Sequence, residues 1–112
     1  MTFWEMEQLE EVVAEFNREH RLEVELDTIR EIYGEDIVET MAHQQEDVLR
    51  NMEYLVKRNF GESVSDICNR FGILLLEDPK IFEERVNGLI ADMGEDYVNL
   101  LAEDMSPWGD LM

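Results

Sequence analysis

A short motif, an apolar or aromatic residue followed by Gly-Glu, occurs three times and limits how this chain can fold. The copies read Tyr33-Gly34-Glu35-Asp36-Ile37-Val38, Phe60-Gly61-Glu62-Ser63-Val64 and Met93-Gly94-Glu95-Asp96-Tyr97-Val98. Each copy lies between two stretches whose apolar residues have helical spacing. Glycine adopts the left-handed backbone conformation at low cost, so it suits the position just after a helix. The acidic residues that follow are favoured in the first turn of the next helix, at the positive end of its dipole. The motif therefore predicts helices joined by tight Gly-Glu corners.

The apolar spacing as a whole predicts an all-α fold, a compact bundle or short stack of five to six helices that forms a single domain over residues 1–112. A chain of 112 residues has room for one core, and a hydrophobic fraction of 45% is sufficient to fill it. Residues 21–26 alternate polar and apolar side chains, which is the strand period, but only residues 73–76 could pair with them. Because two short strands alone are marginally stable, we interpret residues 22–26 as an extended linker, with a two-stranded patch as the alternative.

The first helix is expected to begin at Thr2-Phe3-Trp4-Glu5, which has the form of a capping box. Its buried stripe would consist of Met6, Leu9, Val12, Val13 and Phe16. Trp4 lies well off the centre of that stripe. It therefore either packs over the helix start, which is the interpretation we favour, or forms an exposed contact for a partner.

Two features divide the middle of the chain. Asp27 is expected to cap a short helix that ends at Tyr33. From residue 35 to residue 59 the helical pattern is nearly continuous, and a straight helix of that length would span about 37 Å, which is long for so small a domain. The polar run His43-Gln44-Gln45-Glu46 is where we expect a bend or break.

The clearest helix start in the chain is Asp78-Pro79, an aspartate cap followed by proline at the first helical position. We expect this helix to continue to Gly94. The helix before it is expected to stop at Gly72, and the apolar run of residues 73–76 is expected to be buried.

Charge is the strongest compositional signal. Nine basic and 28 acidic residues give a net charge of -19, and both halves of the chain share the excess. Such a surface repels nucleic-acid phosphates and anionic membranes and favours basic protein partners. The single cysteine, Cys68, excludes an intramolecular disulfide and suits a reducing compartment, and Glu5 and Glu7 interrupt any apolar run of a signal peptide. We therefore expect a cytoplasmic protein without a membrane segment, with a basic protein partner and no direct nucleic acid. Assembly into a homo-oligomer stays open.

Residues 50–95 place apolar residues and glycines in an order typical of a helical repeat. The positions are Leu55, Gly61, Val64, Ile67, Arg70, Leu74, Leu75, Phe82, Val86, Leu89 and Gly94. In this order they resemble a repeat of the mitochondrial transcription termination factor family, although Gly72 stands where that repeat usually has proline and the order Phe60-Gly61 is reversed. The resemblance implies a curved stack of helices, which the family uses to hold nucleic acid on a basic surface. Because this chain has only nine basic residues, we expect the shape and not the nucleic-acid binding.

No pattern of side chains indicates catalysis, so we expect neither an enzyme nor a bound cofactor or metal. His43 has Glu39 and Asp47 one turn away on either side, a spacing that suits an oxygen-and-imidazole metal site, but we favour a solvated surface histidine. Cys68 has apolar neighbours and one nearby base, Arg70, whereas a reactive thiolate needs an electropositive setting.

The C-terminal part of the chain mixes acidic, aromatic and methionine residues, and no basic residue follows Arg85. Its last helix, from Glu95, is expected to end at Ser106-Pro107. Such a mixture suits contact with a basic, apolar groove of another protein. The candidate partner-binding residues are Trp4, Asp96, Tyr97, Glu103, Asp104, Trp108 and Asp110. For Trp108 the alternative, which we favour, is that it folds back over the last helix.

From these observations we expect a small acidic, non-enzymatic protein that binds other proteins. In its sharpest form it would be an inhibitor that occupies the basic site of a nucleic-acid-binding protein. The alternative is a structural or assembly subunit or chaperone, of phage or mobile-element origin, whose mark would be an exposed apolar patch. A helical-repeat module that binds nucleic acid is the third hypothesis.

Overall fold

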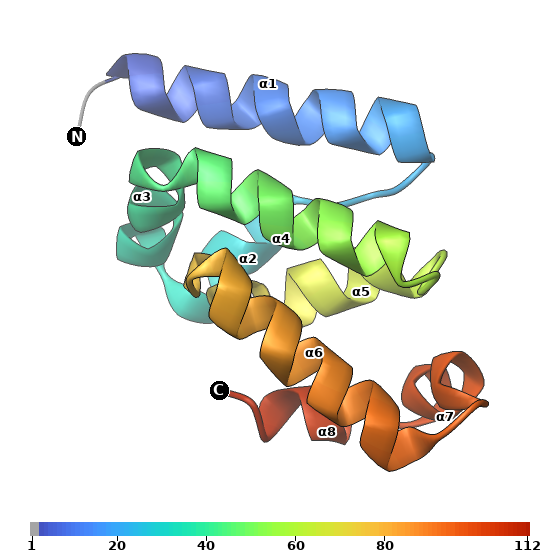
Figure 1. Ribbon diagram of the computed structural model, residues 1–112. Helices are drawn as coiled ribbons and strands as arrows, with labels where there is room; N and C mark the ends of the chain where they lie inside the picture. Colours follow the sequence, from blue (N-terminus) through green and yellow to red (C-terminus); the bar gives the residue numbers. More distant parts are fainter. Residues whose placement is uncertain (1–2) are drawn as a thin grey trace.

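The computed structural model describes residues 3–112, and in that range the chain forms eight α-helices and one 3-10 helix (Figure 1). The elements are α1 (Phe3–His20), α2 (Leu26–Tyr33), α3 (Glu35–His43), α4 (Gln45–Lys57), α5 (Ser63–Arg70), η1 (Gly72–Leu76), α6 (Pro79–Met93), α7 (Tyr97–Glu103) and α8 (Ser106–Gly109). These residues contain no strand, so the all-α prediction is confirmed and the two-stranded patch does not form. The helices are more numerous than the five to six expected. The cap residue Thr2 lies outside the described residues.

Helix α4 lies at the centre of the arrangement, in contact with α1, α3, α5, α6 and η1. Figure 1 shows α1 along one side of the molecule and α7 and α8 on the opposite side, where α7 contacts α6 and Trp108 of α8 packs against Phe60. The radius of gyration is 13.5 Å, close to the value of about 13 Å typical of a compact domain of this length. None of the helices in residues 3–112 combines the length and the apolar character that crossing a lipid bilayer requires.

The three glycines of the repeated motif all have positive φ, which confirms the conformation expected of them. The angles are +94° at Gly34, +59° at Gly61 and +82° at Gly94. The first corner is tight, since α2 ends one residue before Gly34 and α3 begins one residue after it. The other two are longer than expected. Residues 58–62 separate α4 from α5 and residues 94–96 separate α6 from α7, so Glu62 and Glu95 lie in turns rather than in the first turn of a helix.

The expected break within residues 35–59 occurs at Gln44, between α3 and α4. On one side of it, His43 Nδ1 lies 2.6 Å from Glu5 Oε2 of α1. On the other side, Gln45 Nε2 donates to the carbonyl oxygen of Ala42 at 2.8 Å. Because the chain bends here, both α3 and α4 can pack against α1.

The apolar run of residues 73–76 belongs to the 3-10 helix η1, whose buried residues are Gly72, Leu74 and Leu75. At Gly72 an added Cβ would lie 3.1 Å from the side chain of Ile29, so the glycine permits a close approach between η1 and α2. The fully buried Asn51 of α4 donates from Nδ2 to the carbonyl oxygens of Leu75 (3.0 Å) and Glu77 (2.9 Å). These two hydrogen bonds fix the end of η1 to the centre of the molecule.

The linker between α1 and α2, residues 22–25, is extended as expected, and side chains of two helices bind its backbone. From α1, Asn17 Oδ1 accepts from the N–H of Val24 and Asn17 Nδ2 donates to the carbonyl oxygen of Val24, both at 2.9 Å. From α5, Ser65 accepts from the N–H of residue 23 at 2.8 Å. Asn69 accepts from the N–H of residue 25 at 2.7 Å and donates to the carbonyl of residue 23 at 2.9 Å. The linker is therefore hydrogen-bonded on both edges without a second strand.

Three predicted helix boundaries have different outcomes. The cap at Asp78 is confirmed, because its side chain accepts from the N–H of Lys80 at 3.0 Å and proline follows it. The prediction that Asp27 caps α2 is wrong, since the helix already begins at Leu26. Ser106-Pro107 does not end the last helix but begins α8, because proline suits the first turn of a new helix as well as the end of an old one.

Candidate protein-binding surface

The outer face of α1 carries a tryptophan and a row of glutamates. Trp4 is 72% exposed, so the favoured interpretation that it packs over the helix start is wrong. Glu7, Glu11 and Glu15 are exposed and follow one another at four-residue intervals, about 6 Å apart along the helix axis. The opposite side of the helix is buried through Leu9, Val13 and Phe16. This amphipathic division leaves one strip of α1 free for contact with another molecule.

The aromatic residues of the C-terminal part are held by the core. The ring of Phe60 meets Tyr97 at a centroid distance of 5.5 Å and Trp108 at 5.3 Å, both edge to face. Tyr97 donates its hydroxyl to the carbonyl oxygen of Arg58 at 2.6 Å. Trp108 is 0% exposed, which agrees with the interpretation that it folds back onto the protein. It is therefore inaccessible to a partner in this structure.

The acidic candidates of the same region remain at the surface, where Asp96, Glu103, Asp104 and Asp110 are exposed. Asp104 accepts from the hydroxyl (2.6 Å) and the backbone N–H (3.0 Å) of Ser106, and these hydrogen bonds hold its pKa below the ordinary value. Since α7 and α8 lie opposite α1 in Figure 1, the structure does not bring these residues together with Trp4.

Several cations of the chain, Arg30, Arg58 and Arg85 among them, lie at joints between elements. Within residues 3–112 the ion pairs are Arg30–Asp27 (2.5 Å), Arg30–Glu35, His43–Glu5 (2.6 Å) and Arg85–Glu77 (3.9 Å). Arg58 instead binds the side chains of Tyr54 and Asn87, and Arg85 also donates to the carbonyl oxygen of Leu111 at 2.6 Å. Only four of the 28 carboxylates therefore take part in an ion pair among the described residues.

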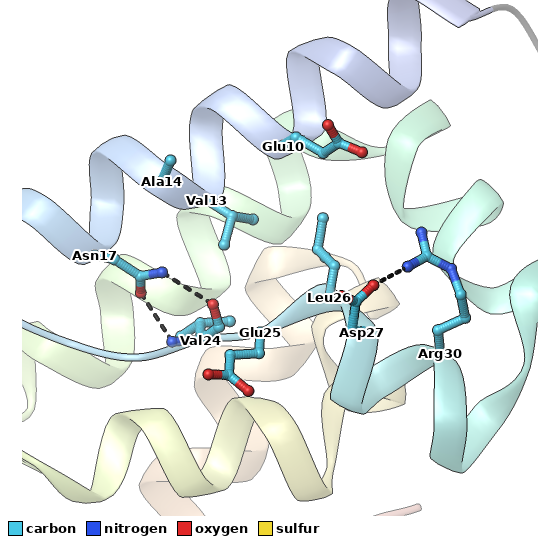
Figure 2. A pocket seen from close by; sticks show the side chains of 9 residues that line it. All are labelled: Glu10, Val13, Ala14, Asn17, Val24, Glu25, Leu26, Asp27 and Arg30. Atoms are coloured by element: carbon cyan, nitrogen blue, oxygen red, sulfur yellow. Dashed lines mark hydrogen bonds and ion pairs between the residues drawn. The ribbon is translucent and has the colours of Figure 1, made fainter.

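An open groove of about 480 Å³ lies between α1 and residues 24–30 (Figure 2). Its lining consists of Glu10, Val13, Ala14, Asn17, Val24, Glu25, Leu26, Asp27 and Arg30. Figure 2 shows the apolar side chain of Leu26 between Glu10 on α1 and Asp27 on α2, with Val13 on α1 to one side of it. The hydrogen bonds between Asn17 and Val24 lie at one end, and the guanidinium of Arg30, paired with Asp27, lies at the other. The groove thus combines an apolar floor with carboxylates from both walls.

His43 and Cys68 are the two residues that the sequence offers for a metal site and a reactive thiol. His43 pairs with Glu5 of α1, and in residues 3–112 no group of three His, Cys, Asp or Glu side chains is placed to hold a metal ion. Cys68 is fully buried, and this burial raises the pKa of its thiol to about 12. Burial also raises the pKa of Tyr33, whose hydroxyl donates to the carbonyl oxygen of Arg70.

The sequence does not predict the groove. One of its walls has a local pattern, because Glu10, Ala14 and Asn17 occupy one face of α1 beside the buried stripe. The other wall comes from the linker and α2, whose position depends on contacts with α5 that no local pattern indicates.

Comparison of the chain with protein-family models, with curated proteins and with solved structures finds no match.

Proposed function

We propose that this protein is a small acidic, non-enzymatic binding module that occupies the basic site of a nucleic-acid-binding protein. The observation that carries the proposal is the small number of carboxylates that have a cation of the same chain beside them. A basic partner can neutralise such carboxylates without first breaking internal ion pairs. The attraction also speeds encounter with that partner.

The outer face of α1 is the part of the surface best suited to this contact. Glu7, Glu11 and Glu15 form a regular row of negative charges on a rigid helix, as phosphates do along a nucleic-acid strand. Trp4 at the end of the row adds a large exposed aromatic side chain, a residue type that often dominates binding energy at protein interfaces. Charge would then attract the partner, and the tryptophan would anchor it.

The cytoplasm is the compartment that we propose for this activity. A buried, unpaired Cys68 is stable in a reducing environment, and basic nucleic-acid-binding proteins are found there.

A capture experiment tests the proposal. The tagged protein is incubated with nuclease-treated cell extract at low and at high salt, and bound proteins are eluted with excess nucleic acid. We expect basic nucleic-acid-binding proteins to be captured at low salt, to be released by nucleic acid and to be lost at high salt. Replacement of Glu7, Glu11 and Glu15 by Gln should reduce capture more than the same replacement of the exposed Glu31, Glu53 and Glu84, which changes the net charge equally.

Two outcomes would overturn the proposal. Capture that persists at high salt and resists nucleic acid would indicate an apolar assembly role instead. Retention of labelled DNA or RNA by the purified protein would contradict the charge argument and favour a nucleic-acid-binding module.

A further inference from the structure

The groove between α1 and α2 contains the features that an arginine side chain of a protein partner needs. A long basic side chain presents an aliphatic stem and a charged head, and the stem favours apolar surface while the head favours carboxylates. Val13, Ala14 and Leu26 provide the apolar surface, and Glu10 and Asp27 provide a carboxylate on each wall. The volume of about 480 Å³ lies within the range of about 300–1,000 Å³ of pockets that bind small ligands.

The protein already binds one guanidinium at this place. Arg30 lies at the end of the groove, donates to Asp27 at 2.5 Å and also pairs with Glu35 of α3. Its Nη2 lies 4.0 Å from the sulfur of Met6 on α1. Arg30 thus occupies Asp27 on the α2 wall, whereas Glu10 of α1 lines the same groove and has no ion pair within residues 3–112.

The walls of the groove are fixed before any partner arrives. Val24 is 3% exposed and is bound to Asn17 through both backbone groups, so the linker cannot move away from α1 without breaking two hydrogen bonds. A site that is formed in advance loses less conformational entropy on binding, which favours affinity.

We propose that this groove receives an arginine side chain from the basic partner, with the stem over Leu26 and the guanidinium between Glu10 and Asp27. This inference rests on the proposed function and names the place where the partner inserts a side chain. Arginine fits better than lysine because its planar group can donate to both carboxylates at once.

The test uses a short fluorescent arginine-rich peptide and the same peptide with citrulline, which keeps the shape and removes the charge. The full-length protein should bind the arginine peptide saturably and the citrulline peptide weakly. Glu10→Gln should weaken binding by about fivefold, the upper range for one exposed ion pair, whereas Glu84→Gln on α6 changes the net charge equally and should have a smaller effect. Ala14→Arg places a guanidinium of the same chain in the groove and should abolish saturable binding, while Ala91→Arg on the exposed side of α6 should not.

Amide chemical shifts of the ¹⁵N-labelled protein locate the peptide, and melting curves of each variant confirm folding. Shifts that centre on Ala14, Leu26 and Asp27 would support the groove. Equal effects of Glu10→Gln and Glu84→Gln, or shifts confined to Glu11 and Glu15, would refute the groove and leave the proposed function intact. Peptide binding in the groove together with no capture of basic proteins from extract would refute the proposed function and leave the groove as a site for arginine.

Discussion

Replacing Asn17 by alanine removes the side chain that binds the extended linker to α1. Asn17 contributes one donor and one acceptor to the backbone of Val24, each at 2.9 Å, and Val24 is only 3% exposed. In the variant the N–H and carbonyl of Val24 lose their partners where water has poor access. An unpaired buried group costs about 1–3 kcal/mol, and because these two hydrogen bonds are only partly buried we expect a total loss in the lower part of the combined range, about 2–4 kcal/mol. That is a large share of the roughly 5–15 kcal/mol by which domains of this kind are stable.

The matched control is Asn69→Ala on α5, which binds the other edge of the same linker. Its hydrogen bonds to residues 23 and 25 are exposed, so water can replace them, and the expected loss is about 0.5–1.5 kcal/mol. Both variants exchange asparagine for alanine within a helix, so the gain in helix propensity is similar in the two. The difference between them therefore reports burial of the hydrogen bonds.

Urea unfolding followed by tryptophan fluorescence and by circular dichroism measures both losses. Asn17→Asp keeps an acceptor for the N–H of Val24 but places a carboxylate against its carbonyl oxygen, and it should fall between the wild type and Asn17→Ala. At about 4 °C per kcal/mol for a domain of this size, Asn17→Ala should lower the melting temperature by about 8–16 °C. If Asn17→Ala costs no more than Asn69→Ala, the bonds to Val24 do not hold the linker and the reasoning fails.

Three further predictions address the corners, the thiol and the C-terminal turn. Gly88→Ala, exposed within α6 with open space around it, should stabilise by about 0.5–1 kcal/mol, and Gly94→Ala, at φ +82° and ψ -162°, should destabilise by about 1–3 kcal/mol. Calorimetry should give melting shifts of opposite sign, and shifts of the same sign would contradict a glycine-only corner. Cys68 should be unreactive toward a disulfide reagent at about pH 8 until urea unfolds the chain, and rapid labelling of the folded protein would disprove its burial. Ser106→Ala should raise the pKa of Asp104 toward the ordinary value in an NMR titration. Because the folded pKa is depressed, this stabilisation is present at neutral pH and disappears as the pH falls through the folded pKa, and an unmoved titration would rule out the hydrogen bonds as its cause.

The features that sequence predicts correctly are set by residues close together in the chain. The positive φ of Gly34 is required by a corner only one residue long, and the start of α6 is determined by the side chain of Asp78 and the ring of Pro79. The break at Gln44 falls where several polar residues interrupt the apolar spacing. In each case the physical cause acts within one helical turn, so no knowledge of the rest of the fold is necessary.

The features that sequence does not predict depend on residues far apart. The hydrogen bonds that hold the linker join residues 23 and 25 to Ser65 and Asn69 of α5, and nothing in the alternating pattern indicates these partners. Trp4 and Trp108 both lie near an end of the sequence with an acidic residue within two positions, but Trp4 is exposed and Trp108 packs against Phe60. The groove also depends on distant residues, because α5 holds the linker that forms part of its second wall.

The positions of the arginines explain how so acidic a chain can fold and still present negative charge. A large net charge disfavours the compact state through repulsion, so contacts that join separate elements are important in this chain. Arg30 joins α2 to α3, Arg58 at the end of α4 binds Asn87 of α6, and Arg85 on α6 donates to the carbonyl oxygen of Leu111. These three cations bind at joints of the fold and not on the outer face of α1, where Arg18 is the basic residue in line with Glu11 and Glu15. In the groove, Arg30 already pairs with Asp27, and the arginine that we propose for a partner would bind beside it.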